Sequence, residues 1–560
     1  MPMNSTPPPV HFDDSTETHR VLNQSRPLEG YNSYTGDTAL REAVERHGAL
    51  WAQADLVAHG ERCGSADVYQ WGFDANAFKP QFASHDRQGF RVDLVTYHES
   101  YHRLMNLAMT EGLHADPWLD PRAGAHVARA AKYFLQAQVE SGHGCPVTMT
   151  FAAIPTLKLA PPVAGQWCPK ILKRQYDPRN IPHTDKDCLT VGMGMTEKQG
   201  GSDVRANTTR AHRVTNDVWA LTGHKWFTSA PMCDGFLVLA QTEAGVTCFL
   251  VPRWRDDGSK NALYVQRLKN KMGNVANASS EIEMRRAMGW LVGEPGRGIP
   301  AIIQMVAMTR FDCMIGSAAA QRQALSQAIN HAEGRQAFGH PLLEQPLMRQ
   351  VLADLALEVE GSIALTMRMA EALDRSLSPQ GSPHEDLLLR LGLPVGKYWI
   401  CKRTPGLVYE AMECLGGNGV TEEFIMARLY RDAPINAIWE GSGNIQALDV
   451  WRAIAKSPGV VDAWLSELEI TQNAHPLLDK AVSALKTMLY TTQNQEAQGR
   501  VVAVQLALTL QASLLVRGGS SAVAEAFIQS RLGAGVAAGL TFGTLPEGLD
   551  VTTLLQRAAP

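Results

Sequence analysis

The sequence predicts an α+β fold that is mainly helical, because the spacing of apolar residues changes twice along its 560 residues. Apolar side chains recur with helical spacing through the first part of the chain. From residue 208 to residue 283, short apolar runs alternate with turn residues, which is typical of β-strands. Helical spacing returns at Ile299. We therefore expect four regions: an N-terminal helical domain (1–187), an antiparallel β domain (188–296), a helical domain (297–449) and a C-terminal helical extension (450–560).

The N-terminal region contains four segments with helical spacing and with glycine or proline at or near their ends. They cover residues 38–57, 97–112, 125–142 and 152–159. The leader, MPMNSTPPPVHFDD, lacks the basic-then-apolar order of a signal peptide, so we expect disorder there. The nine cysteines form no CxxC pair. An odd number of unpaired cysteines favours free thiols in a reducing cytoplasm.

The β region consists of strand pairs separated by turns. Residues 208–214 and 218–222 flank the turn signal Asn216–Asp217. A second pair, 236–241 and 246–252, flanks Ala244–Gly245. Two further runs, 265–269 and 280–283, complete the predicted antiparallel domain.

The remaining chain is predicted to be helical. One long helix or two cover residues 299–335, and others cover 345–375 and 387–414, with the Ser/Pro linker Ser376–His384 between them. A further helical stretch starts at Ile445. The longest apolar run, Val501–Val516, is too short for a membrane span and contains polar residues, so we interpret it as a buried helix.

The first functional motif is Val191–Asp203, VGMGMTEKQGGSD, in which a mostly apolar run ends in a polar, glycine-containing turn. Gly200 and Gly201 let the backbone approach a ligand closely, since they lack a Cβ. Thr196 and Ser202 add hydroxyl groups that donate or accept hydrogen bonds. The alternative is an ordinary hairpin corner with polar residues.

The second motif is INAIWEGSGNIQ, residues 435–446, in which Glu440 follows an apolar run that includes Trp439. A carboxylate in an apolar setting has a raised pKa, which suits a base that removes a weakly acidic proton. The alternative is a surface glutamate near the start of a helix, where its negative charge interacts favourably with the helix dipole.

Together, the MTEKQGGSD and WEGSGNIQ segments resemble the acyl-CoA dehydrogenase family of flavoproteins, and most of all its AidB-like subgroup. The resemblance covers nearly the whole chain. It implies the family's fold with extra helices beyond residue 450, FAD as cofactor, and Glu440 as catalytic base. The substrate is then acyl-CoA or a related small molecule, which loses its α-proton to Glu440 and its β-hydrogen as hydride to flavin N5. A glutamate here counts against nitroalkane oxidation, for which relatives use aspartate.

The resemblance also assigns the cofactor contacts. For the flavin they are Met195, Thr196, Gly201, Ser202, Phe227, Thr228, Ser229 and Trp439. For the adenine arm, which the family binds with a neighbouring subunit, they are Arg335, Phe338, Gln345, Gly416, Gly417 and Asn444. The shared site implies a homotetramer. Glu413 departs from the family's glutamine and would repel a pyrophosphate unless it points away, is paired or is protonated; Asn444 replaces a glutamine but keeps the amide.

The partners that the resemblance implies are an electron acceptor, either an electron-transfer flavoprotein or oxygen, and double-stranded DNA. The alternative function is accordingly a DNA-binding flavoprotein of the alkylation-damage response with little dehydrogenase turnover. Residues 450–560 hold eight Lys/Arg and eight Asp/Glu, so the extension has no net positive charge. Arg452, Arg517 and Arg531 are candidate phosphate contacts if they share one face. Solvated or packed arginines are the simpler interpretation.

The segment His98–His102 matches HExxH, a zinc-binding pattern when it lies on a helix. His114 is the nearest third ligand, but no extended zinc-protease signature follows. Histidines on a helix face explain the segment better, so we predict no metal.

Overall fold

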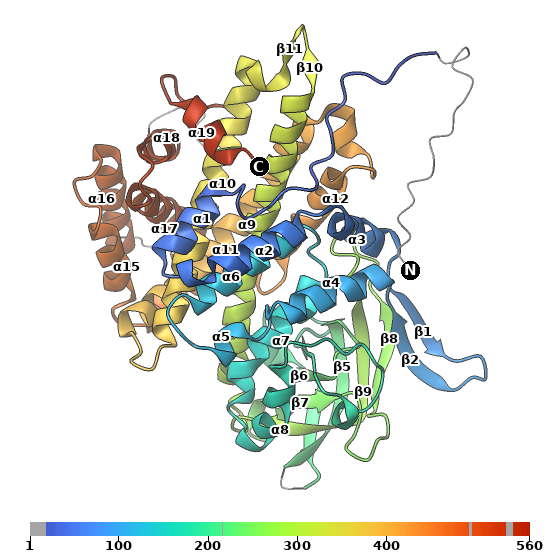
Figure 1. The fold of residues 1–560 in the computed structure, drawn as a ribbon. Coiled ribbons are helices and arrows are strands. Elements are labelled where there is room, and N and C mark those ends of the chain that lie inside the picture. The colour runs from blue at the N-terminus through green and yellow to red at the C-terminus, as the bar shows by residue number, and fades with distance from the viewer. Residues whose placement is uncertain (1–17, 216, 492–494, 534–540) are drawn as a thin grey trace.

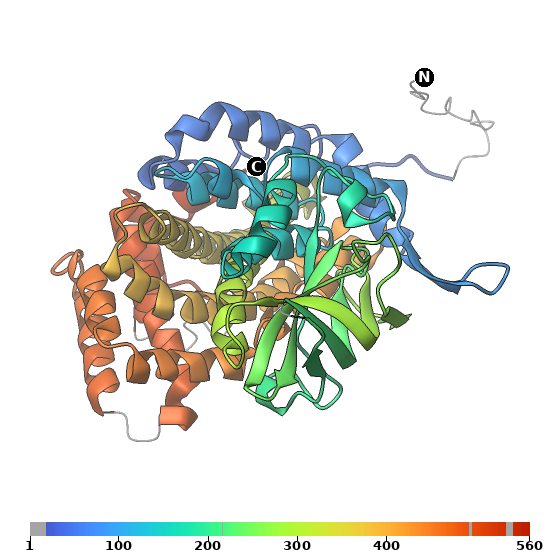
Figure 2. The same cartoon turned by 90° about the horizontal axis from the view of Figure 1, so that it is seen from below.

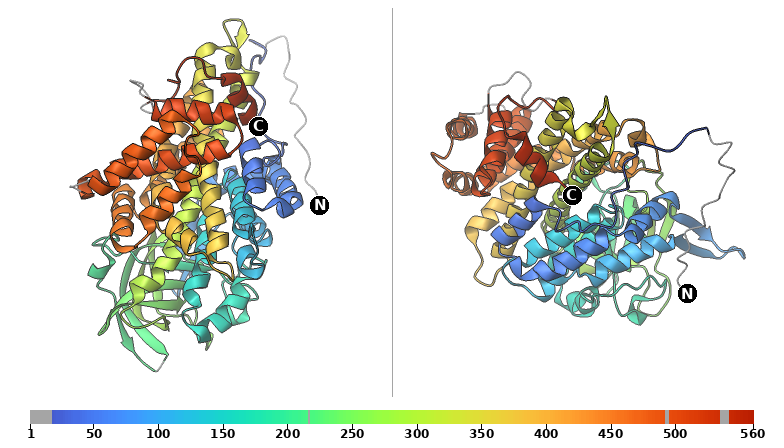
Figure 3. Two further views of the ribbon diagram at one scale, coloured as in Figure 1. Left: turned by 90° about the vertical axis from the view of Figure 1, so that its left-hand side faces the viewer. Right: turned by 45° about the horizontal axis from the view of Figure 1, so that its top comes forward.

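The computed structural model describes residues 18–560 apart from residue 216, residues 492–494 and residues 534–540 (Figure 1). The predicted order of helices, β domain and helices is confirmed, and so is the mainly helical α+β class. The long central helices lie between the N-terminal helices on one side and the C-terminal helices on the other (Figure 3). Residue 216, half of the predicted Asn216–Asp217 turn, is outside the described residues.

The N-terminal region is helical except for one hairpin that the sequence analysis did not predict. Strands β1 and β2 pair antiparallel and project from the side of the molecule (Figure 1). Asp93 Oδ2 accepts a hydrogen bond from Val265 N at 3.3 Å, so the hairpin contacts the β domain. The elements are α1 (Thr38–Arg46), α2 (Gln53–Cys63), α3 (Ala66–Ala77), β1 (Gln81–His85), β2 (Arg91–Thr96), α4 (Glu99–Thr110), α5 (Asp116–Leu119), α6 (Ala125–Ala137), α7 (Gly144–Leu157) and α8 (Pro161–Ile171).

The β domain forms one sheet whose strand order is β3-β6-β4-β5-β9-β7, with β8 on β9. An additional pairing of β6 with β7 joins the second strand of this order to the last one. Seen from below, the sheet lies beside the N-terminal and the long helices (Figure 2). Most pairs are antiparallel as predicted, but β3 runs parallel to β6 and β4 also makes a parallel pairing with β6. The strands are β3 (Val191–Gly194), β4 (Arg210–Arg213), β5 (Val218–Ser229), β6 (Gly235–Thr242), β7 (Gly245–Pro252), β8 (Leu263–Leu268) and β9 (Ser279–Val292).

The helical core follows the β domain. Helix α9 is one continuous helix and packs on α6, α7, α10 and α11. Inside this packing, Arg129 of α6 pairs with Asp312 of α9, and both side chains are almost fully buried. The elements are α9 (Gly298–Gly334), β10 (Gln336–Ala337), β11 (His340–Pro341), α10 (Pro346–Ser376), α11 (Pro383–Cys414), α12 (Ile425–Asp432), α13 (Ile435–Ile438) and α14 (Gly443–Lys456).

The C-terminal extension packs on the core through apolar and ionic contacts. Helix α17 contains the apolar run predicted to be buried; by length and hydropathy alone it and α9 could cross a membrane, but both are mostly buried within the protein. The helices are α15 (Val460–Glu469), α16 (Pro476–Thr491), α17 (Gln495–Arg517), α18 (Ser521–Leu532) and α19 (Val551–Ala558).

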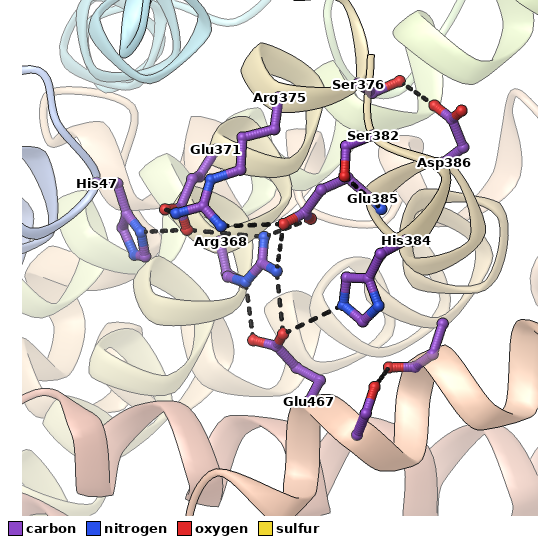
Figure 4. A network of polar contacts seen from close by, with 12 residues as sticks. His47, Arg368, Glu371, Arg375, Ser376, Ser382, His384, Glu385, Asp386 and Glu467 are labelled. Atoms are coloured by element: carbon purple, nitrogen blue, oxygen red, sulfur yellow. Dashed lines mark hydrogen bonds and ion pairs between the residues drawn. The ribbon is translucent and has the colours of Figure 1, made fainter. Parts of the chain in front are cut away.

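A buried ionic network joins the extension to the core (Figure 4). Arg368 of α10 donates to Glu385 of α11 at 2.9 Å and to Glu467 of α15 at 2.8 Å. Arg517 of α17 also donates to Glu467, at 2.6 Å. Burial opposes the charged form of Glu467, but the hydrogen bonds and charges of the two arginines outweigh it and lower its pKa to about 2. One carboxylate therefore fixes α15 and α17 to α10.

A second ionic contact joins segments far apart in the chain. Arg557 of α19 pairs with Glu42 of α1 at 2.8 Å and with Glu360 of α10 at 2.7 Å. Helix α19 thereby completes the packing around α1.

Candidate active site

The loop that carries Glu440 (the base loop, residues 439–442) joins α13 to α14 and has an unusual backbone. Glu440 has a φ of 58° and Gly441 a φ of 95°, so two consecutive residues are left-handed. For a residue with a Cβ this conformation costs about 1–2 kcal/mol. The surrounding structure must hold Glu440 in place, as is common at functional sites.

Two side chains fix the base loop on both sides of Glu440. Lys397 lies inside α11 and is 1% exposed. Its Nζ donates hydrogen bonds to Trp439 O at 2.7 Å and to Gly441 O at 2.5 Å. Gln446 of α14 donates Nε2 to Glu440 O and Gly441 O, both at 2.9 Å. The sequence analysis missed Lys397; its one signal is a lysine within the apolar run LGLPVGKYWI.

The carboxylate of Glu440 is held by α9. Thr309 Oγ1 donates to Glu440 Oε2 at 2.8 Å, and Arg310 Nε donates to the Glu440 carbonyl at 3.1 Å. Burial raises the pKa of Glu440 above its usual value, while the Thr309 hydrogen bond and the charges of Lys397 and Arg310 partly oppose the rise. A carboxylate with a raised pKa is a stronger base, as the chemistry of a C–H proton requires.

The first motif forms a rigid loop at the end of β3. Glu197 and Lys225 of β5 make an ion pair of 2.8 Å in which neither side chain is exposed. Burial disfavours the Glu197 carboxylate, but the Lys225 charge and several donated hydrogen bonds outweigh it and lower the pKa of Glu197. A Cβ on Gly201 would lie 2.3 Å from Thr196 Oγ1, so any larger residue there would force the Thr196 side chain to move. Met195 is partly buried and Ser202 is exposed.

The end of β5 carries the other predicted flavin contacts. Thr228 is fully buried, and its Oγ1 has no hydrogen-bond partner among the described residues. Ser229 Oγ lies 3.1 Å from Ser279 Oγ, to which Lys271 Nζ donates at 3.1 Å. The Phe227 side chain is 48% exposed. A buried hydroxyl without a partner costs free energy unless a ligand uses it.

Cys145, at the start of α7, connects the base loop to the β5 wall. Burial raises the pKa of its thiol to about 11; Lys271 and a hydrogen bond with Ser229 oppose the rise, and the charge of Glu440 adds to it. The same thiol therefore senses Ser229 and Glu440. Ser229 and Glu440, which are more than 200 residues apart in the sequence, both act on this one thiol. No pattern in the sequence marks Cys145.

The predicted adenine-arm residues lie elsewhere in the protomer. Arg335, Phe338 and Gln345 belong to or flank the β10–β11 hairpin, at the end of the long helices remote from the β domain (Figure 1). Along α9, Thr309 and Gly334 are separated by roughly 38 Å at 1.5 Å per residue. Phe338 is 97% exposed. One protomer therefore does not bring these three side chains to Glu440.

The other adenine-arm positions are solvent-accessible. Gly416 and Gly417 are exposed after α11. Glu413 is exposed and accepts a hydrogen bond from Tyr409 Oη at 2.9 Å, a neutral partner that does not offset a carboxylate charge. Asn444 is exposed in the first turn of α14, and its Oδ1 accepts from Arg500 Nε at 2.9 Å.

The HExxH histidines have structural contacts. His98 precedes α4, where its ring stacks on Phe78 and its Nδ1 accepts from Ser100 N at 3.2 Å. His102 Nδ1 is hydrogen-bonded to Tyr176 Oη at 2.8 Å. His114 is buried against Lys173 O. These contacts agree with the interpretation of the segment as helix-associated histidines.

The three candidate DNA-binding arginines differ in exposure. Arg452 is exposed on α14. Arg517 is paired with Glu467, and Arg531 is 3% exposed at its side chain and paired with Asp354 and Glu358. The guanidinium of Arg531 lies between two carboxylates, so the structure lends no support to a phosphate contact there. A count of charges along a sequence does not separate such buried arginines from solvated ones.

Three family models match the chain in succession. They are the adaptive response protein AidB N-terminal domain (residues 23–178), the acyl-CoA dehydrogenase middle domain (192–287) and the acyl-CoA dehydrogenase C-terminal domain (296–455). The chain is 46% identical to the Escherichia coli (strain K12) protein AidB over 92% of its own length and 95% of that protein's. This chain belongs to the acyl-CoA dehydrogenase family. It is an FAD-dependent oxidoreductase of the type that acts on CH–CH donors.

Solved structures agree with this assignment. The Caenorhabditis elegans protein ACDH-11, solved in complex with C11-CoA, superposes with a TM-score of 0.84 and 25% identity over 93% of this chain and 94% of that one. The apo form of Bd2924 superposes with a TM-score of 0.80 and 26% identity over 90% and 99% of the two chains. Both comparisons cover the C-terminal extension as well as the dehydrogenase core.

Proposed function

We propose that this protein dehydrogenates an acyl thioester between Cα and Cβ, with Glu440 as the base that takes the α-proton. Bound FAD supplies the acceptor for the β-hydride at flavin N5. The observation that carries the proposal is the conformation of the base loop, in which two consecutive residues are left-handed and three donors hold their carbonyls. A strained backbone that several side chains hold in place supports a functional role for Glu440.

The neighbouring groups fit the same chemistry. Thr309 orients the Glu440 carboxylate through its 2.8 Å hydrogen bond. The Glu440 amide N–H has no acceptor among the described residues, so it is available to the thioester carbonyl, whose oxygen gains negative charge as the proton leaves. The Thr228 hydroxyl has no hydrogen-bond partner among the described residues, and the resemblance to the family assigns it, with Gly201, to the flavin site. These groups would hold the flavin opposite the base.

An anaerobic titration tests this function. The purified flavoprotein is mixed with short, branched and long acyl-CoAs while its visible spectrum is recorded. We expect one chain-length class to bleach the flavin, and Glu440→Gln to bind the same ligand without bleaching. Flavin that binds but never bleaches with any acyl-CoA would refute the dehydrogenase proposal.

Several properties accompany this proposal. The remote position of Arg335, Phe338 and Gln345 supports an adenine arm completed by a neighbouring subunit, and hence a homotetramer. The electron acceptor is an electron-transfer flavoprotein or oxygen, and the compartment is the cytoplasm. A measurement of the molar mass of the FAD-bound protein in solution tests the proposed homotetramer.

DNA binding is the second candidate function, favoured by the match to the adaptive response protein AidB N-terminal domain and by the exposed Arg452. A gel shift with double-stranded DNA should weaken steeply as salt rises, and Arg452→Ala should reduce the salt slope by about 1. Absence of a shift at low salt would exclude this function.

A further inference from the structure

A segment ahead of the first helix (the strap, residues 19–26, HRVLNQSR) lies on the outside of the protein beside the β10–β11 hairpin (Figure 1). Its Asn23 has a left-handed backbone, with a φ of 57°. The Asn23 Oδ1 accepts a hydrogen bond from Gln336 N at 2.7 Å, and its Nδ2 donates to Gln336 O at 2.9 Å. One side chain therefore occupies the edge of β10 as a neighbouring strand would.

The strap backbone is also held by the end of α9. Arg335 Nη1 donates to Asn23 O at 2.7 Å. Asn330 Nδ2 donates to Arg26 O at 2.8 Å. The strap is thus attached at both of its ends to the segment that leads from α9 into the hairpin.

Between these contacts the strap approaches α9 closely at Ser25. The Ser25 Oγ lies 3.1 Å from His331 Nδ1. A Cβ on Gly334 would lie 2.9 Å from both the Cα and the Cβ of Ser25. Because that approach is too close for a side chain, alanine at position 334 would displace the strap.

The strap presents apolar side chains to solvent. Val21 is 78% exposed and Leu22 is 74% exposed. At the same end of the long helices, Phe338 at the tip of the hairpin is 97% exposed and Leu347 in the first turn of α10 is 82% exposed. Large apolar side chains that are exposed together indicate a contact with another molecule.

The strap is basic, and a surface beyond the end of α11 has the opposite charge. The strap contains Arg20 and Arg26 and no acid, and neither guanidinium has an ion pair among the described residues. Glu413 and Glu423 are exposed beyond α11, also without an ion pair in the part of the chain that the structure describes, and Val420 beside them is 66% exposed. The two surfaces are complementary in charge, and each has an apolar part.

We propose that the strap docks on a second copy of this chain, with its arginines against the acidic surface beyond α11. Each protomer carries both surfaces, so the contact forms twice in a two-fold pair. The inference rests on the homotetramer of the proposed function. A second copy is the expected occupant because Arg335 and Phe338, which the strap supports, are remote from Glu440 of their own protomer. The unexpected acid at position 413 then meets a cation of the partner.

Charge reversal tests the docking in the full-length, FAD-bound protein, by molar mass measured over a series of protein concentrations. Arg20→Glu/Arg26→Glu should raise the dissociation constant of the assembly about tenfold, because like charges then face each other. Glu413→Arg/Glu423→Arg should weaken the assembly similarly. The variant that combines all four substitutions should regain most of the wild-type affinity.

Two further variants test the apolar contact and the seat of the strap. Val21→Asp/Leu22→Asp should weaken the assembly about tenfold, since it places acids against an acidic surface. Gly334→Ala should weaken it by displacing the strap, without lowering the melting temperature of the dissociated protomer, because alanine suits a helix better than glycine. Phe90→Asp is the matched control: Phe90 is 72% exposed beside β2, and its replacement should leave the assembly unchanged.

The outcomes separate this inference from the dehydrogenase function. A wild type that is monomeric at every concentration overturns the strap contact, as do strap variants that assemble like the wild type. Equal weakening by Phe90→Asp, or charge reversals that their combination does not rescue, also overturn it, as does a loss of DNA or lipid binding with no change in mass. A protein that assembles through the strap but is never bleached by an acyl-CoA refutes the dehydrogenase function alone. Bleaching of a monomeric wild type refutes the strap contact alone.

Discussion

Replacing Lys397 by methionine tests how the base loop is held. The Lys397 ammonium donates to the carbonyls of Trp439 and Gly441, which flank Glu440. Methionine keeps a similar volume within α11 but removes both donors. The variant therefore changes the support of Glu440 without changing the residues that would touch substrate.

The structure sets the size of the effect. Gly441 O keeps the hydrogen bond from Gln446, whereas Trp439 O loses the one donor that it has among the described residues. An unsatisfied buried carbonyl costs about 1–3 kcal/mol, so we expect the free energy of unfolding to fall by that amount. The left-handed conformation of Glu440 stores about 1–2 kcal/mol that the loop releases when it relaxes. A misplaced carboxylate should slow flavin reduction roughly a hundredfold.

Anaerobic stopped-flow measurements of flavin reduction across a pH series provide the assay. The Lys397 charge opposes the raised pKa of Glu440, so its removal should raise that pKa further and move the rising limb of the rate–pH profile to higher pH. Lys456→Met, exposed at the end of α14, is the control. A Lys397→Met protein with a wild-type rate and an unshifted profile would refute the reasoning.

Three further predictions concern ionic groups. In the wild type, the raised pKa of Glu440 means that this carboxyl ionises above its usual pH range. The rate of flavin reduction should therefore rise with pH in that higher range. Glu440→Gln should abolish this rising part of the rate–pH profile. Glu197→Gln leaves Lys225 buried without its partner and should lower the free energy of unfolding by about 3–5 kcal/mol, with partial recovery when Lys225→Met is added. Glu467 has a folded pKa of about 2, so its stabilisation of about 3 kcal/mol is fully present above its unfolded pKa near 4.3 and is lost as the pH falls towards 2.

Chemical denaturation measures the last two effects. For Glu467, the wild-type curve is compared with Glu467→Gln at several pH values, and the two should converge in acid. Glu469→Gln is the control, because that carboxylate is exposed at the end of α15 and its surface pair with Lys486 contributes little. A difference in unfolding free energy between the wild type and Glu467→Gln that stays constant with pH would contradict the assigned role of Glu467. A Glu197→Gln/Lys225→Met variant as unstable as Glu197→Gln alone would contradict the role assigned to the buried pair.

The apolar pattern predicted most of the fold because most elements bury a continuous face. Strands β6 and β7 are buried along nearly their whole length, and both were found within one residue of their bounds. The β1–β2 hairpin escaped detection because it covers no core: no residue of β1 is buried and only Val95 of β2 is. The parallel direction of β3 depends on its partner β6, which lies beyond the local sequence.

The candidate site was predictable where its chemistry sits in consecutive residues. Glu440 and Thr196 belong to short contiguous motifs that can be recognised in a single sequence. Thr309, Lys397 and Cys145 do not, since they come from the interiors or ends of helices that only the tertiary fold brings to the base loop. Arg531 shows the opposite failure: a cation that looks available in the sequence is buried by its partners.

The contact between Arg557 and Glu42 has a consequence for how the chain folds during synthesis. These residues are 515 positions apart, so helix α1, made early, lacks its α19 neighbour until almost all of the remaining chain has been made. Closing so long a loop is entropically costly, and contacts of this separation form late and slowly. The face of α1 that carries Glu42 lacks this neighbour throughout that interval. Molecular chaperones that bind exposed apolar segments would have their longest opportunity at this helix, and its protection from hydrogen exchange should be the last to develop during refolding.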